Sequence, residues 1–282
     1  MKRGFNTYCI IGDPIEHSLS PALHNAAFTS LHLNSTYIAY KVPRDELASA
    51  VASLRSLNIS GFNVTMPHKV EILNLVDKKD ASVKKAGAVN TVKNYHGELE
   101  AFNTDIVGFI NPLHKRKVDF NGMVVLLLGA GGAARAILAA LGEVRGISKI
   151  YVSSRNEIKL NQLINAGKDT GLECISAKTN KINTLSESSD LIINATPLGM
   201  SQEPSPISYR NISEKCIVYD IVYKPIITPL ISNAKRANAI VIYGYEMLLE
   251  QAAESFKIWT GMIPPMETMK KVLFGGFGEP SL

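Results

Sequence analysis

The stretch from Val124 to Leu138 constrains the fold most strongly. It opens with an apolar run of Val and Leu that stops at Gly129, and an alanine-rich segment of helical character follows a glycine-rich turn. This order of apolar run, tight turn and helix predicts one strand–helix unit of a parallel sheet. Three glycines and Arg135 interrupt the apolar character, so the stretch is not a membrane span.

The turn has the spacing Gly-x-Gly-x-x-Ala, with Gly129, Gly131 and Ala134. In dinucleotide-binding turns the first glycine permits the sharp bend, the second lets a pyrophosphate approach the backbone, and the small third residue lets helix and strand pack closely. The phosphate then lies at the helix N-terminus. We therefore predict a dinucleotide site here, with a purely structural turn as the alternative. The predicted loop residues are Gly129, Ala130, Gly131, Gly132 and Ala133.

Length and composition limit the class of protein. The 282 residues allow one large domain or two smaller ones, and 46% hydrophobic with 20% charged residues is typical of a globular protein. The net charge of +5 is spread along the chain, which fits small anionic ligands rather than nucleic acid or a membrane. The three cysteines are far apart, so neither disulfides nor a metal site is predicted.

A cytoplasmic location is expected from this cysteine usage. The apolar run from Tyr8 to Ile11 is too short for a signal peptide, which agrees with that expectation. The tail from Gly275 to Pro280 is expected to fray.

The first hundred residues alternate between strand and helix patterns. This alternation predicts a largely parallel sheet. A hairpin across His96 and Gly97 is expected to follow. Strands are expected over Tyr8–Ile11, Tyr37–Val42 and Ile59–Met66, and a helix over Asp45–Leu57.

Ser18 and Ser20 lie at the start of an expected helix. Ser20 is a good N-cap and Pro21 a good first helical residue, so the Ser20 hydroxyl has either a capping role or a ligand to bind. Ser18 has no capping role, which leaves its hydroxyl freer for a ligand.

Lys69 and Asp105 are candidates for proton transfer. Pro67 is expected to start a helix with Lys69 in its first turn, where a cation opposes the helix dipole and gives up its proton more readily. A solvated lysine is the alternative. Asp105 precedes the helical stretch Ile106–Ile110, so capping explains it as well as catalysis does. Spacing alone does not bring the two side chains together.

The strand expected over Lys149–Ser153 ends in Ser154, Arg155 and Asn156. NAD-binding folds usually place an acidic residue here to hold the ribose 2′-hydroxyl, whereas this chain has Arg155, with Lys159 four residues later. A base in place of an acid favours a 2′-phosphate and hence NADP. A solvated arginine is the alternative.

Thr196 and Tyr223 follow two later apolar strands at their carboxyl ends, where ligands of open α/β sheets bind. Beyond them, apolar residues recur at helical spacing from Tyr245 to Trp259, which predicts a core-packed helix. Gln251 borders this stripe, as a flanking residue or as a polar group reaching a ligand. The further strands are expected over Asp190–Ala195, Lys215–Tyr223 and Ile240–Tyr243.

Several motifs stand in order along nearly the whole chain, and together they resemble one family, the shikimate dehydrogenases. The motifs are Gly12-x-Pro14-x-x-His17-Ser18-x-Ser20-Pro21, Asn63-Val64-Thr65-x-Pro67-x-Lys69, Gly87-Ala88-Val89-Asn90-Thr91, Asn103-Thr104-Asp105, Gly129-Ala130-Gly131-Gly132-Ala133, Asn194-Ala195-Thr196-Pro197-Leu198-Gly199-Met200, and Gly244-Tyr245-Glu246-Met247-Leu248 leading to Gln251.

The resemblance implies an α/β protein of two domains with the active cleft between them. Residues 1–104 would form the substrate domain, residues 105–241 a Rossmann-type NADP domain, and residues 242–282 helices that pack back on the first domain. The implied reaction is the reversible NADPH-dependent reduction of 3-dehydroshikimate to shikimate in aromatic amino-acid biosynthesis, by a monomer or homodimer.

The resemblance also assigns residues. Lys69 and Asp105 would be the acid–base pair. The substrate would be held by Ser18, Ser20, Asn63, Thr65, Asn90, Tyr223 and Gln251. Beyond the glycine loop, NADP would contact Ser154, Arg155, Asn156, Lys159, Thr196 and Gly244.

Two positions depart from the family pattern. Ala101 stands where glycine is usual, which implies strain if the site needs a positive φ. Ser154-Arg155-Asn156 replaces an Asn-Arg-Thr-like stretch, which leaves tolerance of NAD open. The alternatives are a quinate/shikimate or aminoshikimate dehydrogenase, and a non-catalytic NADP-binding regulator. Ser18, Ser20 and Arg155 favour the biosynthetic enzyme, and the presence of both Lys69 and Asp105 argues against the regulator.

Overall fold

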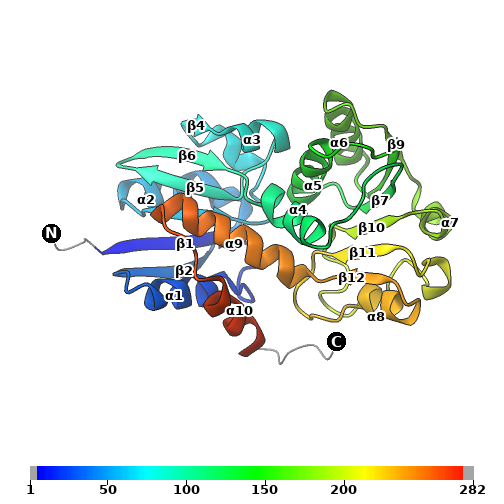
Figure 1. Ribbon diagram of the computed structural model, residues 1–282. Coiled ribbons are helices and arrows are strands. Elements are labelled where there is room, and N and C mark those ends of the chain that lie inside the picture. Colours follow the sequence, from blue (N-terminus) through cyan, green and yellow to red (C-terminus); the bar gives the residue numbers. More distant parts are fainter. Residues whose placement is uncertain (1–4, 276–282) are drawn as a thin grey trace. The chain divides into compact units, whose positions relative to one another are not determined.

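The computed structural model describes residues 5–275, which divide into two compact units (Figure 1). The first unit contains the chain up to Gly108 and from Leu249 onward, and the second contains Phe109–Leu248. Helices α4 (Asp105–Lys115) and α9 (Gly244–Thr260) carry the chain from one unit to the other. No helix within the described residues is long and apolar enough to cross a bilayer.

The first unit is built on a mixed six-stranded sheet. β1 runs parallel to β2 and β3, as the alternating pattern predicts, whereas β5 is antiparallel to β3 and β6. His96 and Gly97, both at positive φ, form the predicted hairpin turn between β5 and β6. The sheet order is β2-β1-β3-β5-β6-β4. The strands are β1 (Asn6–Gly12), β2 (Ser35–Lys41), β3 (Gly61–Val64), β4 (Lys78–Lys79), β5 (Thr91–Tyr95) and β6 (Glu98–Phe102).

The helices of this unit bury apolar stripes against the sheet. In α2, Leu47, Val51 and Leu54 recur at helical spacing and are buried with the core residue Phe62 of β3. The C-terminal helix α10 packs against α1 (Figure 1). These helical elements are α1 (Ser20–Ser30), η1 (Arg44–Glu46), α2 (Leu47–Ser56), η2 (Glu71–Asn74), α3 (Ala81–Ala86) and α10 (Met266–Gly275), where η denotes a 3₁₀ helix.

The helix predicted to start at Pro67 is wrong. A turn follows β3, and the short η2 begins only at Glu71. The reason is a tertiary hydrogen bond, because the carbonyl oxygen of Lys69 accepts the N–H of Val89 at 2.7 Å and is not available to a helix. The helix-dipole argument for Lys69 therefore does not hold.

Ala101 is unstrained. It lies inside β6, opposite Val92 of β5, and is fully buried. It is not among the described residues with positive φ, so the expected strain is wrong. The tail that is expected to fray lies, after Gly275, outside the described part of the chain.

The second unit is a Rossmann-type sheet of six parallel strands in the order β12-β11-β10-β7-β8-β9. Read from β9, this is the 3-2-1-4-5-6 order of dinucleotide-binding folds. Val125 to Leu127 of β7 are fully buried, which explains the continuous apolar run. The strands are β7 (Val124–Leu128), β8 (Lys149–Ser153), β9 (Cys174–Ser176), β10 (Leu191–Asn194), β11 (Ile217–Asp220) and β12 (Ile240–Ile242).

Helices connect these parallel strands, as a parallel sheet requires. α5 begins directly after the glycine-rich turn, as predicted, and α6 connects β8 to β9. The helical elements are α5 (Gly132–Gly142), α6 (Glu157–Asp169), η3 (Thr179–Lys181), α7 (Ile182–Glu187), η4 (Tyr209–Asn211) and α8 (Pro229–Arg236).

Gly61 of β3 leaves room for the α9 residue Trp259 to pack against the first sheet. A Cβ at this position would overlap the indole of Trp259, whose Nε1–H donates to the carbonyl oxygen of Val92 at 2.9 Å. We expect Gly61→Ala to displace the indole and lower the free energy of unfolding by about 1–3 kcal/mol, the usual cost of overpacking a core. Urea denaturation measures this, and a variant as stable as the parent would show that the indole moves without cost.

Candidate active site and dinucleotide loop

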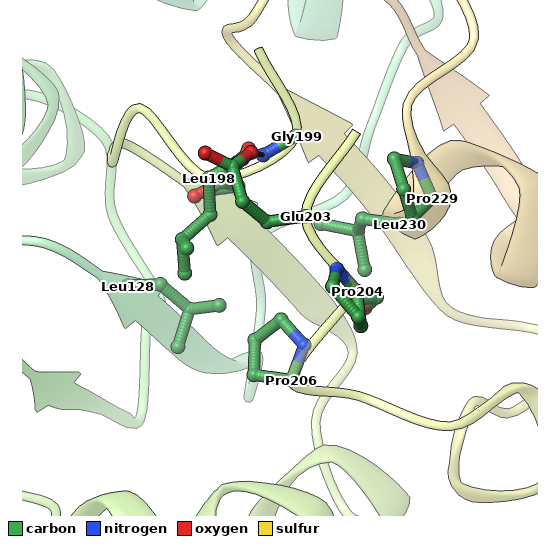
Figure 2. Close-up of a pocket in the computed structure, with 10 residues that line it drawn as sticks. Leu128, Leu198, Gly199, Glu203, Pro204, Pro206, Pro229 and Leu230 are labelled. Atoms are coloured by element: carbon green, nitrogen blue, oxygen red, sulfur yellow. Dashed lines mark hydrogen bonds between the residues drawn. The ribbon is translucent and has the colours of Figure 1, made fainter. Parts of the chain in front are cut away.

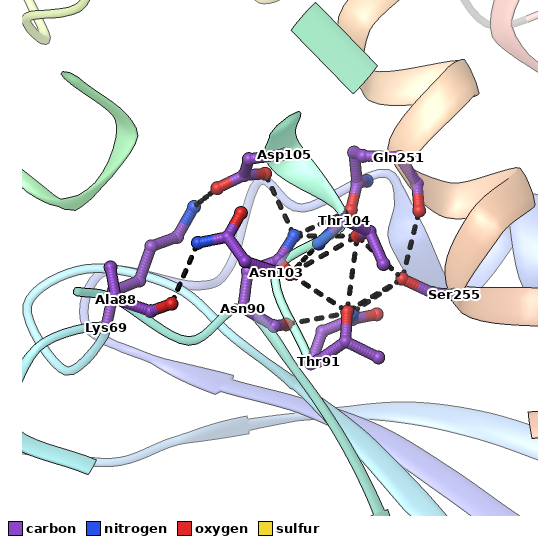
Figure 3. Close-up of polar contacts among 10 residues, drawn as sticks. Lys69, Ala88, Asn90, Thr91, Asn103, Thr104, Asp105, Gln251 and Ser255 are labelled. Carbon is purple, nitrogen blue, oxygen red and sulfur yellow. Dashed lines mark hydrogen bonds and ion pairs between the residues drawn. The ribbon is translucent and has the colours of Figure 1, made fainter. Parts of the chain in front are cut away.

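Lys69 and Asp105 form an ion pair inside the first unit. Lys69 lies in the turn after β3 and Asp105 is the first residue of α4, yet Lys69 Nζ is 2.6 Å from Asp105 Oδ2 (Figure 3). Their side chains are only 17% and 6% exposed. The carboxylate also benefits from its place at a helix N-terminus. The structure thus brings together two residues that lie 36 positions apart.

Asn90 binds the other oxygen of the same carboxylate. Its Nδ2 donates to Asp105 Oδ1 at 2.9 Å, while its Oδ1 accepts the backbone N–H of Thr104 at 2.7 Å. Gln251 Oε1 lies 3.4 Å from the same Nδ2 (Figure 3). One carboxylate oxygen of Asp105 is therefore bound by Lys69, and the other is bound by the Asn90 amide. Asn90, Asp105, Lys69 and Gln251 form one cluster, as the family resemblance implies.

Ser18 and Ser20 have different surroundings from those expected. α1 begins at Ser20 itself, and its N-cap is Leu19 without a side-chain cap bond. The capping role predicted for Ser20 is wrong. Ser18 Oγ instead accepts the N–H of Ser20 at 3.3 Å, so the upstream serine satisfies a free donor of the first turn. Ser20 is buried and Ser18 half-buried.

Asn63 and Thr65 lie at the carboxyl end of β3. Asn63 Oδ1 accepts the Tyr37 hydroxyl at 2.6 Å, and its Nδ2 has acceptors in the Asn90 carbonyl and the Thr91 hydroxyl, each at 3.0 Å. The buried amide of Asn63 is thus engaged within the protein. Thr65 is half-buried, and its N–H donates to the carbonyl oxygen of Ile11.

The glycine-rich turn is shaped to receive a pyrophosphate. Gly129 has φ +112°, and a Cβ there would lie 2.8 Å from the carbonyl oxygen of Ala195, so only glycine fits. Gly131 caps α5 without a side chain, and a Cβ there would meet nothing within 4 Å. The N-terminus of α5 therefore faces open space, which suits an anion. Ala134 is fully buried, as close packing of the helix requires.

The turn after β8 uses two of its three polar residues for its own structure. Asn156 Oδ1 accepts the N–H of Lys159 at 2.9 Å and caps α6, and Ser154 Oγ accepts the N–H of Asn156 at 3.2 Å. Arg155 and Lys159 are exposed. Within residues 5–275 no ion pair engages the Arg155 guanidinium.

Tyr223 and Gly244 lie in the second unit, near the carboxyl end of β11. Tyr223 is half-buried in the loop after that strand. Gly244 starts α9, and a Cβ there would overlap the backbone carbonyl of Val222 in the same loop. The start of α9 is therefore packed directly on the Tyr223 loop.

A polar network that the sequence reasoning missed joins the loops after β10 and β11. Asp220 Oδ1 accepts from Asn194 Nδ2 at 2.9 Å and Oδ2 from the Thr228 hydroxyl at 2.6 Å, while Asn194 Oδ1 accepts the Thr196 hydroxyl at 2.6 Å. Asp220 is fully buried, and burial raises its pKa to about 6. The available sequence signal was an acidic residue within the apolar stretch that forms β11.

The loop after β10 closes on a cavity of only about 10 Å³ (Figure 2). Leu198, Pro204 and Leu230 line it, and Glu203 Oε2 holds the loop by accepting the N–H of Gly199 at 2.9 Å. This volume holds about one water molecule, so the cavity is no ligand site. It belongs to the packing that fixes the loop carrying Thr196.

A Rossmann sheet with an open phosphate-binding turn, together with a shielded lysine–carboxylate pair, defines a dinucleotide-dependent oxidoreductase. Residues 10–92 match a family profile described as the shikimate dehydrogenase substrate binding domain, and residues 244–274 match the shikimate 5'-dehydrogenase C-terminal domain. The chain belongs to the shikimate dehydrogenase family.

Individual relatives that match nearly the whole chain bear the name of the same family. A protein named shikimate dehydrogenase (NADP(+)) from Nitrosopumilus maritimus is 46% identical over 96% of this chain and 99% of its own length. One of the same name from Bacillus cereus is 39% identical over 96% and 98%. The crystal structure of the Thermus thermophilus shikimate 5-dehydrogenase in complex with NADP(H) and shikimate is 32% identical, with a TM-score of 0.84 over 97% of this chain and 100% of that one.

The raised pKa of Asp220 predicts a pH dependence of stability. Its pKa is about 6 in the folded protein against an ordinary 3.8, so the folded state favours the protonated form. This contribution is complete below about pH 4 and is lost as the pH rises through 6, by up to about 3 kcal/mol at about 1.4 kcal/mol per pKa unit. We expect the stability of the parent relative to Asp220→Asn to fall between pH 4 and 7.

Urea denaturation at several pH values measures this difference. Asp190→Asn, at an exposed aspartate beside the same sheet, is the control. If the two variants track the parent equally across this pH range, Asp220 does not titrate there.

Proposed function

We propose that this chain is an NADP-dependent shikimate dehydrogenase that interconverts 3-dehydroshikimate and shikimate, with Lys69 and Asp105 as its acid–base pair. The observation that carries the assignment is the shielded contact of 2.6 Å between Lys69 Nζ and Asp105 Oδ2, with Asn90 on the other carboxylate oxygen. Relatives that bear this activity in their names and align over nearly their whole length support the reaction and the cofactor.

The ion pair suits proton transfer to and from a hydroxyl. Reduction of a ketone leaves negative charge on its oxygen, and the Lys69 ammonium has two N–H groups beyond the one directed at Asp105. In the direction of alcohol oxidation the neutral amine accepts the proton, and the Asp105 carboxylate stabilises the ammonium that forms. Bound NADP(H) supplies or accepts the hydride.

The nearby histidines are less suited to this role. His24 is fully buried, and burial lowers its pKa to about 3. His68 is also fully buried, and its Nε2 lies 2.7 Å from the carbonyl oxygen of Val42. Burial leaves neither side chain exposed to a ligand.

Substrate recognition is assigned to the first unit and to Tyr223 of the second. We infer that Ser18 and Ser20 bind the carboxylate, and that the remaining polar groups bind the hydroxyls. The Asn63 and Asn90 amides are both hydrogen-bonded within the protein, so each would bind a hydroxyl by exchanging one of these bonds. The residues proposed to bind the hydroxyls are Asn63, Thr65, Asn90, Tyr223 and Gln251.

The phosphate groups of NADP are assigned to the second unit. The N-terminus of α5, reached through Gly129–Ala133, would bind the pyrophosphate, and Arg155 the 2′-phosphate, with Lys159 beside it. Thr196 and Gly244 would shape the wall toward the nicotinamide. On this basis residues 1–104 are the substrate domain, 105–241 the NADP domain, and 242–282 the returning helical segment.

We also propose a cellular location and an oligomeric state for the protein. Its three cysteines, Cys9, Cys174 and Cys216, are free and buried, which agrees with a cytoplasmic location. A monomer or homodimer is expected, and sedimentation analysis measures which of the two forms.

Removing the lysine tests the acid–base pair. We expect Lys69→Ala to lower kcat for shikimate oxidation by about 10²–10⁴, the usual contribution of a general acid or base, with NADPH affinity near that of the parent. The fold is retained, but the melting temperature falls because Asp105 loses its shielded partner. Asp105→Ala should cost a similar factor, and the double variant little more, because the two residues act as a unit. Near-parental turnover of Lys69→Ala, or two losses that multiply, would refute the pair.

Removing the arginine tests the cofactor assignment. We expect Arg155→Ala to raise the KM for NADP on the order of ten- to a hundredfold through the loss of charge-assisted hydrogen bonds of roughly 1.5–3 kcal/mol, with little change for NAD. Lys168→Ala removes an exposed charge at the far end of α6 and should change neither constant. Steady-state kinetics with both cofactors measures this, and equal losses for NADP and NAD contradict the assignment.

A further inference from the structure

Three buried side-chain hydroxyls form a group next to the side-chain amide of Asn90. Thr91 comes from β5, Thr104 from the residue before α4, and Ser255 from the C-terminal helix α9 (Figure 3). Ser255 Oγ is 2.9 Å from Thr91 Oγ1 and 3.1 Å from Thr104 Oγ1. Each of the three residues is at most 1% exposed, so no bulk water can replace a missing partner. We call these residues the hydroxyl cluster.

The hydroxyl cluster and the adjoining backbone determine how the Asn90 amide is oriented. The backbone N–H of Thr104 can only donate, so the atom it contacts at 2.7 Å must be Asn90 Oδ1. The Thr91 hydroxyl can donate to the same oxygen at 3.0 Å. The amide nitrogen then faces Thr104 Oγ1 at 2.8 Å and Asp105 Oδ1 at 2.9 Å.

Ser255 supplies an acceptor for the hydroxyl protons of the other two residues in the cluster. Its own hydroxyl donates to the carbonyl oxygen of Gln251, one helical turn earlier, at 2.9 Å. Its oxygen is therefore an acceptor for the surrounding groups, including Asn63 Nδ2 at 3.2 Å. It can accept the hydroxyl proton of Thr91 at 2.9 Å or of Thr104 at 3.1 Å, and the other threonine then donates to Asn90 Oδ1. Either arrangement leaves the lone pairs of Thr104 Oγ1 directed at Asn90 Nδ2.

We propose that Ser255 is a positioning residue for proton transfer, which accepts one threonine proton of the hydroxyl cluster and thereby steadies the Asn90 amide that binds Asp105 Oδ1, opposite Lys69 on Oδ2. The inference rests on the proposed acid–base role of Lys69 and Asp105. It gives α9 a second contribution besides Gln251, because one turn of this helix holds both the predicted ligand-binding amide and the group that orders the carboxylate. Without Ser255, the Thr91 and Thr104 hydroxyls both have Asn90 Oδ1 as an acceptor, at 3.0 and 3.2 Å, and compete for it.

Ser255→Ala tests the proposal against a matched control. Ser186 on α7 is also fully buried, and its hydroxyl also donates to a backbone carbonyl of its own helix, at 2.7 Å, but it lies in the second unit. We expect Ser255→Ala to lower kcat for shikimate oxidation on the order of three- to tenfold, the effect of one neutral hydrogen bond, with the KM for NADP unchanged. Ser186→Ala should keep the parental kcat. Ser255→Cys, which preserves volume but accepts hydrogen bonds weakly, should reproduce the loss if the alanine variant folds poorly.

Coupling to Asn90 separates positioning from a general loss of packing. If Ser255 acts through Asn90, Ser255→Ala should have no further effect on kcat in an Asn90→Ala background. An equal loss in both backgrounds, or a Ser255→Ala variant with parental kcat, would overturn the proposal.

Exchange of the Asn90 side-chain amide protons, followed by NMR and assigned with Asn90→Ala, gives a readout that needs no turnover. Ser255→Ala should accelerate this exchange and Ser186→Ala should not, whereas unchanged exchange in Ser255→Ala would overturn the proposal. A parent protein that shows the exchange difference but does not oxidise shikimate would refute the proposed function and leave the positioning role intact.

Discussion

The shielded ion pair between Lys69 and Asp105 is the interaction on which the rest of the first unit depends. Two charges held this far from water are costly unless their remaining hydrogen-bonding groups are satisfied. Here the second carboxylate oxygen is bound by Asn90, the carboxylate lies at the start of α4, and the lysine backbone is held to the chain at Val89. The mixed sheet serves this arrangement, because the β5–β6 hairpin carries Asn90 and Asp105 at its two ends, and β3 leads into the lysine turn.

Local patterns predicted those parts of the fold that are decided by local physics. The apolar run of β7, the turn at Gly129 and the start of α5 agree with the structure because glycine conformation and strand burial are readable from adjacent residues. The turn around Lys69 was predicted as a helix because its deciding contact, with Val89, comes from another part of the chain. The pairing of Lys69 with Asp105 came from family resemblance, since no spacing rule joins residues across a sheet.

Sequence reasoning missed Asp220 and Ser255 because the role of each depends on its burial in the folded protein. Asp220 ends the apolar strand β11, and the fold buries it beside Asn194 and Thr228, which raises its pKa. Ser255 borders the apolar stripe of α9 and could pass for a neutral helix residue. Its role depends on the proton assignments of neighbours drawn from three other segments, and these are defined only once the chain has folded.

In the turn after β8, one set of residues holds the backbone and another residue is proposed to bind the 2′-phosphate. Ser154 and Asn156 hold the backbone, whereas Arg155 projects from it and contributes nothing to that scaffold. Because the fold does not depend on the Arg155 side chain, natural selection can exchange it without first acquiring a compensating mutation. On the proposed assignment, coenzyme preference therefore rests on a side chain that this scaffold does not use, whereas Lys69 and Asp105 are held by buried polar contacts.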